Sequence, residues 1–87
     1  MTESERRANL VLTEVGERIA GLRATHGLAL ETAAELAGID PERLAGAEGG
    51  ELALEDAELR RLSETFNVDL TALFGGRVTP LSYLAGA

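Results

Sequence analysis

The chain has 87 residues, of which 45% are hydrophobic and 26% charged, which is the size and composition of one small globular domain. It contains no cysteine, which excludes disulfides and thiolate metal sites and predicts a reducing, cytoplasmic location. Eight basic residues, all arginine, stand against 15 acidic ones, and the net charge of −7 argues against a broad polyanion-binding surface while leaving a local one open. No apolar run approaches the roughly 18 residues of a membrane span, and no signal-peptide pattern opens the chain.

Leucine, alanine, glutamate and arginine dominate the composition while aromatic residues make up only 3%, and this predicts an all-α fold. In chain order, residues 1–9 are polar and charged and predict a frayed arm. The apolar stripe of a first helix follows, formed by Leu12, Val15, Ile19 and Leu22. Thr13 is a candidate cap for its start and Gly27 for its end, but Ala8 continues the stripe backwards, so a start near Ser4 is also open.

The next two predicted helices are joined by a short turn. The first covers about residues 30–37 and is closed by Gly38. Its inward positions are small, so that a neighbouring helix can approach closely; they are Ala33, Ala34 and Ala37. Asp40 and Pro41 then form a cap-and-proline start for a third helix, which runs to about Glu48.

Two further helices complete the predicted domain. One covers about residues 54–66 and carries an ion pair between Asp56 and Arg60, one turn apart. The other is a short helix capped by Asp69. Together these elements predict a compact, all-α, five-helix domain with a short C-terminal extension. The expected division of the chain is a polar arm, the helical domain and an apolar tail, at residues 1–12, 13–75 and 76–87.

One set of residues has the order and spacing of a known family. The set comprises Val15-Gly16-Glu17-Arg18-Ile19, Leu22-Arg23, Gly27-Leu28, Glu31, Ala34, Gly38-Ile39, Leu44, Glu48, Gly50, Leu59, Leu62, Asn67-Val68-Asp69-Leu70 and Leu73-Phe74-Gly75. Over about residues 13–75 it resembles the phage-repressor and Cro-like helix-turn-helix family, often called XRE. The resemblance implies a DNA-binding transcriptional regulator that acts as a dimer and places the helix at 41–48 in the major groove.

The resemblance also implies which residues face DNA. They are Asp40, Pro41, Glu42, Arg43, Ala45 and Gly46. Reading bases needs long donors and acceptors, and only Arg43 combines reach with positive charge, whereas the charge of Glu42 is unfavourable beside phosphates. This makes the recognition helix atypical for its family. The resemblance further implies a partly buried ion pair between Arg23 and Glu48.

Apolar residues support a second hypothesis, in which a degenerate helix-turn-helix domain binds a protein. Leu30 and Leu52 occupy positions that are polar in DNA-reading relatives, and Leu36 falls where a charged residue is ordinary. Leu81 and Leu84 make the tail apolar, so the tail either folds back over the last helices or meets the same segment of a second chain. Two functions therefore stay open: a dimeric DNA-binding regulator, and an interaction module for a partner regulator or a toxin with little or no sequence-specific DNA binding.

Neither catalysis nor metal binding is predicted. The sequence arranges no base beside the hydroxyl groups of Ser63, Thr65 or Tyr83. His26 is a lone histidine without partners at metal-ligand spacing, and no phosphate-binding glycine loop is present. We therefore expect no enzyme activity and no cofactor.

Overall fold

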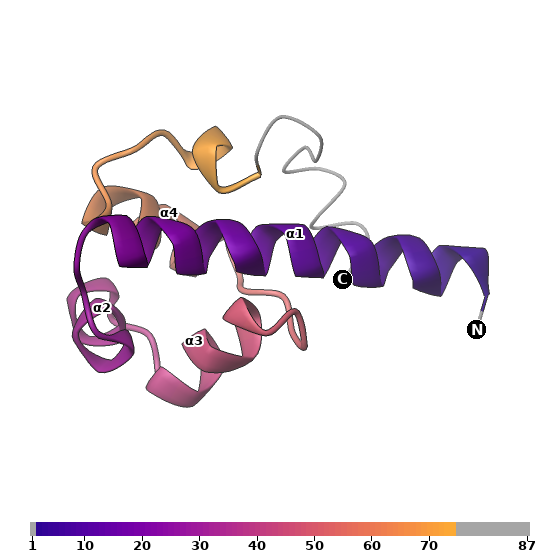
Figure 1. Cartoon of the computed structure of the whole chain (residues 1–87), viewed down its shortest axis with the longest axis horizontal. Coiled ribbons are helices and arrows are strands. Elements are labelled where there is room, and N and C mark those ends of the chain that lie inside the picture. The colour runs from indigo at the N-terminus through magenta and orange to yellow at the C-terminus, as the bar shows by residue number, and fades with distance from the viewer. Residues whose placement is uncertain (1, 75–87) are drawn as a thin grey trace.

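A computed structural model describes residues 2–74, apart from the side chains of residues 7–9. Its elements are, in chain order, α1 (Glu3–Thr25), α2 (Leu30–Ala37), α3 (Pro41–Glu48), α4 (Asp56–Thr65) and the 3-10 helix η1 (Leu70–Leu73) (Figure 1). This part of the chain holds no strand, and the all-α prediction is confirmed. No helix within it is both long and apolar enough to cross a membrane. The predicted tail at 76–87, with Leu81 and Leu84, lies outside the described residues.

The first helix begins well before Thr13. Thr2 caps it: the Thr2 hydroxyl accepts a hydrogen bond from the Glu5 amide (3.2 Å), and the Glu5 carboxylate accepts one from the Thr2 amide (3.3 Å). This reciprocal pair is a capping box, which satisfies two amides at a helix start. The prediction of a frayed arm over residues 1–9 is therefore wrong from Glu3 onward, and the expected boundary after residue 12 falls inside α1.

The helix α1 forms the long axis of the molecule. Its 23 residues span about 35 Å at about 1.5 Å per residue, and the longest dimension of the structure is 36 Å. Both α3 and η1 pack against α1, and Figure 1 shows them on opposite sides of it. The core between the helices consists of Val15, Ile19, Ala33, Ala34, Ala37, Ile39, Leu44, Ala47, Leu54, Leu59, Leu62, Phe66, Leu73 and Phe74.

The helix-turn-helix unit consists of α2, a turn and α3. Gly38 ends α2 in the left-handed conformation (φ 67°, ψ 36°), which glycine adopts at the least cost. The Ile39 amide donates to a carbonyl in the last turn of α2 (2.9 Å), and the Ile39 side chain is buried. Asp40 accepts a hydrogen bond from the Glu42 amide (2.8 Å) and Pro41 takes the first helical position, so α3 begins where its local signals predict.

The last two elements differ in detail from the prediction. The helix α4 begins at Asp56 rather than near Leu54, which is buried in the core as part of the preceding loop. The predicted ion pair on α4 is present, with 2.7 Å between Arg60 Nε and Asp56 Oδ2. The fifth helix is the 3-10 turn η1, and Asp69 makes no side-chain cap bond there. Its carbonyl instead accepts a hydrogen bond from the Ala72 amide (2.9 Å), because 3-10 geometry joins residues three apart through the backbone.

Candidate nucleic-acid interface

The six residues that the resemblance assigns to DNA contact lie along α3 and at its start, and we call them the α3 face. Two of them, Arg43 and Gly46, are half-buried. The other four are exposed: Asp40, Pro41, Glu42 and Ala45. The exposed side chains therefore carry two carboxylates and no cation, which is the wrong sign for direct contact with phosphates.

Arg43 forms an ion pair with Glu58 on α4. Arg43 Nε lies 2.9 Å from Glu58 Oε2, and Arg43 Nη2 lies 2.7 Å from Glu58 Oε1. Glu58 Oε1 also accepts a hydrogen bond from the Glu55 amide (2.8 Å) at the start of α4. The Glu58 side chain is 10% exposed and that of Arg43 43%. Sequence reasoning missed Glu58, because the partners are 15 residues apart and no local pattern links them.

The stability that this pair provides is expected to disappear at acidic pH. Hydrogen bonds from the Arg43 guanidinium lower the pKa of Glu58 from its ordinary 4.5 against the opposing effect of burial, and the Glu55 amide lowers it further. A carboxyl whose pKa is lower in the folded state contributes stability above its unfolded pKa and loses it as the pH falls through the folded pKa. The melting temperatures of wild type and Glu58→Gln should therefore differ most near neutral pH and converge below about pH 4.5. A difference that stays constant into strong acid would contradict this.

Gly46 and Leu52 contact each other. A Cβ atom placed on Gly46 would lie 2.8 Å from Leu52 Cδ2, so the leucine occupies the space beside the glycine. Leu52 is half-buried and packs against the core. Gly46 on the α3 face and Leu52 after α3 thus pack against each other within one chain. Contact with a partner protein is not needed to explain either residue.

The leucines predicted to contact a partner differ in exposure. Leu30 is half-buried and packs against the core, as Leu52 does, and this packing explains why both positions are apolar. Leu36 on α2 is 63% exposed. It borders a shallow hollow between α2 and α4 that is otherwise lined by Arg61, Glu64 and Thr65. Apolar surface near the helix-turn-helix unit therefore lies at Leu36, not at Leu30 or Leu52.

A second ion pair holds the end of α3 to α1. Arg23 Nε lies 2.8 Å from Glu48 Oε2, and Arg23 Nη2 lies 2.9 Å from Glu48 Oε1. Arg23 Nη1 donates to the Leu28 carbonyl (3.0 Å) in the loop before α2. The hydrogen bond to Glu48 raises the pKa of Arg23, so the arginine stays charged throughout the working pH range. One side chain thus ties together α1, the following loop and α3.

The turn is also held from α4. Arg61 Nε donates to the Ala37 carbonyl at the C-terminal end of α2 (2.7 Å). The last turn of α2 contains no basic residue, and Arg61 supplies the positive charge that a helix C-terminus favours. Sequence reasoning missed this contact as well, because 24 residues separate the two partners.

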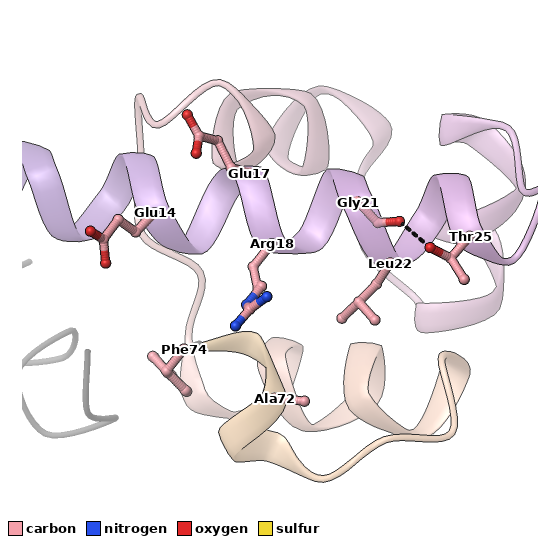
Figure 2. Close-up of a pocket in the computed structure, with 8 residues that line it drawn as sticks. All are labelled: Glu14, Glu17, Arg18, Gly21, Leu22, Thr25, Ala72 and Phe74. Carbon is pink, nitrogen blue, oxygen red and sulfur yellow. Dashed lines mark hydrogen bonds between the residues drawn. The ribbon is translucent and has the colours of Figure 1, made fainter. Parts of the chain in front are cut away.

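A groove of about 710 Å³ lies between α1 and η1 (Figure 2). The 3-10 helix η1 is on the side of α1 away from α3 (Figure 1). Its apolar lining consists of Leu22, Ala72 and Phe74, and Arg18 extends from α1 towards Phe74 (Figure 2). Gly21 also lines it, and a Cβ atom placed there would meet nothing within 4 Å. The groove is therefore open above Gly21. Its remaining lining is polar and comes from Glu14, Glu17 and Thr25.

Within residues 2–74, no three histidine, cysteine, aspartate or glutamate side chains lie together as metal ligands would. His26 is exposed, with its Nδ1 2.8 Å from the Leu22 carbonyl oxygen. Its ring packs near Phe66, with 5.5 Å between the ring centroids. His26 thus closes the end of α1 as a structural residue.

The helix order, the left-handed turn at Gly38 and the uncovered start of α3 define a helix-turn-helix domain of the repressor type. No model of a known protein family and no curated protein matches this chain. Among solved structures, the restriction-modification controller protein C.AhdI from Aeromonas hydrophila is 30% identical, with a TM-score of 0.70, over 72% of this chain and 96% of the controller. An HTH_3 family transcriptional regulator from Vibrio cholerae has a TM-score of 0.73 and 23% identity, over 79% of this chain and 39% of the regulator.

This chain belongs to the phage-repressor and Cro-like (XRE) helix-turn-helix family. The similarity to the controller, which extends over nearly all of the controller's length, establishes the membership, while the Vibrio cholerae regulator supports the fold. Both neighbours are regulatory proteins rather than enzymes. The family predicted from the sequence is thereby confirmed.

Proposed function

We propose that this chain is a DNA-binding transcriptional regulator that acts as a homodimer. The observation that carries the proposal is the α2–turn–α3 unit, in which the start of α3 remains exposed. In helix-turn-helix proteins the second helix of this unit enters the major groove and its first turn reaches the base edges. The similarity to a restriction-modification controller supports a regulatory role for the domain.

The charges around α3 limit the strength of this binding. Proteins obtain much of their affinity for DNA from lysine and arginine contacts to phosphates. Asp40, Glu42 and Glu51 are exposed carboxylates on and just after α3, and Arg43 is neutralised by Glu58. We therefore infer that the regulator makes few phosphate contacts and binds weakly at physiological salt.

The test is a titration of the purified protein against mixed genomic DNA at about 50 mM and about 200 mM salt. We expect binding at low salt and a loss of about tenfold or more in affinity at the higher salt, because even a few phosphate contacts release counterions. Absence of binding at micromolar protein in low salt would contradict the proposal.

Two variants locate the contacting surface in the same titration. Arg43→Ala should weaken binding, because it leaves the Glu58 carboxylate without a partner, and Glu42→Gln should strengthen it by removing repulsion. The matched control is Glu64→Gln, which removes the same charge from an exposed site on α4 and should change binding less. The reverse order of effects would mean that α3 does not contact DNA.

The groove between α1 and η1 supports the dimer. A second copy seated there leaves the α3 face of each copy free, because α3 lies on the other side of α1 (Figure 1). A two-fold dimer is the form in which helix-turn-helix proteins bind two half-sites about 34 Å apart, one turn of DNA. Leu22 and Ala72, which are half-buried, offer it apolar surface, and the core residue Phe74 lies beneath them (Figure 2).

Gly21 makes this dimer testable. Gly21→Gln places a side chain in open space within one copy but in the path of a second copy. We expect light scattering to give the mass of a dimer for wild type and of a monomer for Gly21→Gln, with the helical circular dichroism of the variant unchanged because the new side chain meets nothing within one copy. Ala24→Gln, an exposed site on α1 that does not line the groove, is the control and should stay dimeric.

A second candidate function is binding of a partner regulator or a toxin by a domain that no longer reads DNA. The acidic α3 face and the exposed Leu36 favour it. The salt titration separates the two functions, because only the first predicts binding to DNA at low salt. A negative titration together with a soluble complex that Leu36→Glu disrupts would favour the interaction module.

A further inference from the structure

The hydrogen-bonding capacity of Arg43 is only partly used within the chain. A guanidinium group carries donors on all three of its nitrogens. Glu58 accepts one hydrogen bond from Nε and one from Nη2. Nη1 and the second hydrogen of Nη2 have no partner among residues 2–74, and 43% of the side chain is exposed. Arg43 therefore presents a free edge with two parallel donors.

We propose that Arg43 reads a guanine in the major groove and that Glu58 is the residue that positions it. The proposal rests on the DNA-binding function proposed above. Guanine presents two acceptors, O6 and N7, side by side at its major-groove edge, and an arginine edge with two parallel donors matches them. Glu58 occupies the adjacent edge, formed by Nε and the first hydrogen of Nη2, so Arg43 can bind both groups at once.

Glu58 is itself held in place. Its side chain is 10% exposed, and Oε1 accepts the backbone amide of Glu55 in addition to Arg43. Its helix, α4, packs against α2 and η1, and the neighbouring residue Leu59 is part of the core. The Arg43 guanidinium is thus held in a fixed orientation relative to the rest of the domain. An arginine held in this way loses less conformational freedom when it meets a base than a free side chain does.

The ion pair also decides what kind of contribution Arg43 makes. A free arginine near DNA attracts phosphates of any sequence, and its loss lowers the salt dependence of binding. The charge of Arg43 is balanced by the Glu58 carboxylate, 2.7 Å from Nη2 and 2.9 Å from Nε, so the pair attracts phosphates little. Arg43 therefore contributes to the choice of base rather than to general affinity, which fits an α3 face with no other cation.

The experiment is a binding selection from a library of randomised DNA duplexes, followed by sequencing of the bound fraction. Wild type should enrich a site with a strong guanine preference at one position of each half-site. Glu58→Gln frees Arg43 to attract phosphates, so its affinity for unselected duplex should stay the same or rise. Its guanine preference at that position should fall by roughly tenfold, the value of a good bidentate contact.

Two further variants allow the proposal to be tested even if Glu58→Gln folds poorly. Arg43→Gln replaces a guanine reader with a residue that pairs with adenine, so the preference at the same position should change from guanine towards adenine. Asp56→Asn is the matched control, because it removes a carboxylate from the same helix whose partner is Arg60 rather than Arg43, and it should leave the selected site unchanged.

The outcomes separate the two proposals. A wild type that binds no duplex at low salt would overturn the DNA-binding function and this inference with it. A wild type that selects a site while Glu58→Gln selects the same site equally well would overturn only the inference, and the Arg43–Glu58 pair would then be a brace between α3 and α4. Loss of such a brace in Glu58→Gln or Arg43→Gln would lower the melting temperature without changing the selected base.

Discussion

Gly16→Ala is expected to lower the free energy of unfolding by about 3 kcal/mol, the upper range for overpacking a well-packed interior. Gly16 is buried where α1 crosses the end of α3. A Cβ atom there would meet the Ala47 carbonyl oxygen and lie 2.7 Å from the Glu48 carbonyl oxygen. Both obstacles are backbone atoms, which cannot rotate away as a side chain can, so α3 must shift from α1. Urea unfolding followed by circular dichroism measures the change.

The control for this prediction lies on the same helix. Gly21→Ala makes the same chemical change five residues later, at a site where the added Cβ meets nothing within 4 Å. It should stabilise the protein by about 1 kcal/mol, because alanine is the better helix former. If Gly16→Ala and Gly21→Ala were equally stable, α1 and α3 would not approach each other as closely as the structure has them.

The second large effect is expected at the ion pair between Arg23 and Glu48. The side chains are 24% and 10% exposed, and removal of either leaves the other charge poorly solvated. We expect Arg23→Met and Glu48→Gln each to cost about 2 kcal/mol of unfolding free energy, less than a fully buried pair because solvent reaches the arginine. The double variant should lose clearly less unfolding free energy than the two single variants added together.

A double-mutant cycle measured by urea unfolding gives this coupling. The exposed pair between Arg60 and Asp56 is the comparison, since its side chains are 63% and 51% exposed and its coupling should be much smaller. A coupling near zero for Arg23 and Glu48 would show that the contact does not hold α3 to α1, although their distances are short.

Both predictions bear on DNA binding as well as on stability. Gly16 and the pair of Arg23 with Glu48 set the position of α3 against α1, and neither touches the α3 face. A destabilised but folded Glu48→Gln protein should therefore keep its base preference. Glu58→Gln should instead lose its base preference and keep its affinity for unselected duplex. This difference distinguishes residues that hold α3 from the residue that positions Arg43.

Local signals were sufficient for the helix-turn-helix unit. The bounds of α2, the turn glycine Gly38 and the start of α3 at Asp40 and Pro41 all agree with the prediction, because caps and left-handed turns are chosen by the residues that form them. The start of α1 at Glu3 lies next to Ser4, the earlier of the two starts that the sequence leaves open, and it has an equally local signal in Thr2 and Glu5, whose spacing is that of a capping box.

The sequence by itself determined the fold class, the family and the start of α3, where Asp40, Pro41 and Glu42 are exposed, because helix periodicity, caps and small residues at helix crossings are properties of short segments. Only the tertiary structure decided what those positions can do. It paired Arg43 with Glu58, laid Leu52 beside Gly46 and brought Arg61 to the end of α2. Each of these contacts joins segments that are apart in the sequence, so it depends on how the helices pack together and not on a pattern within any one of them.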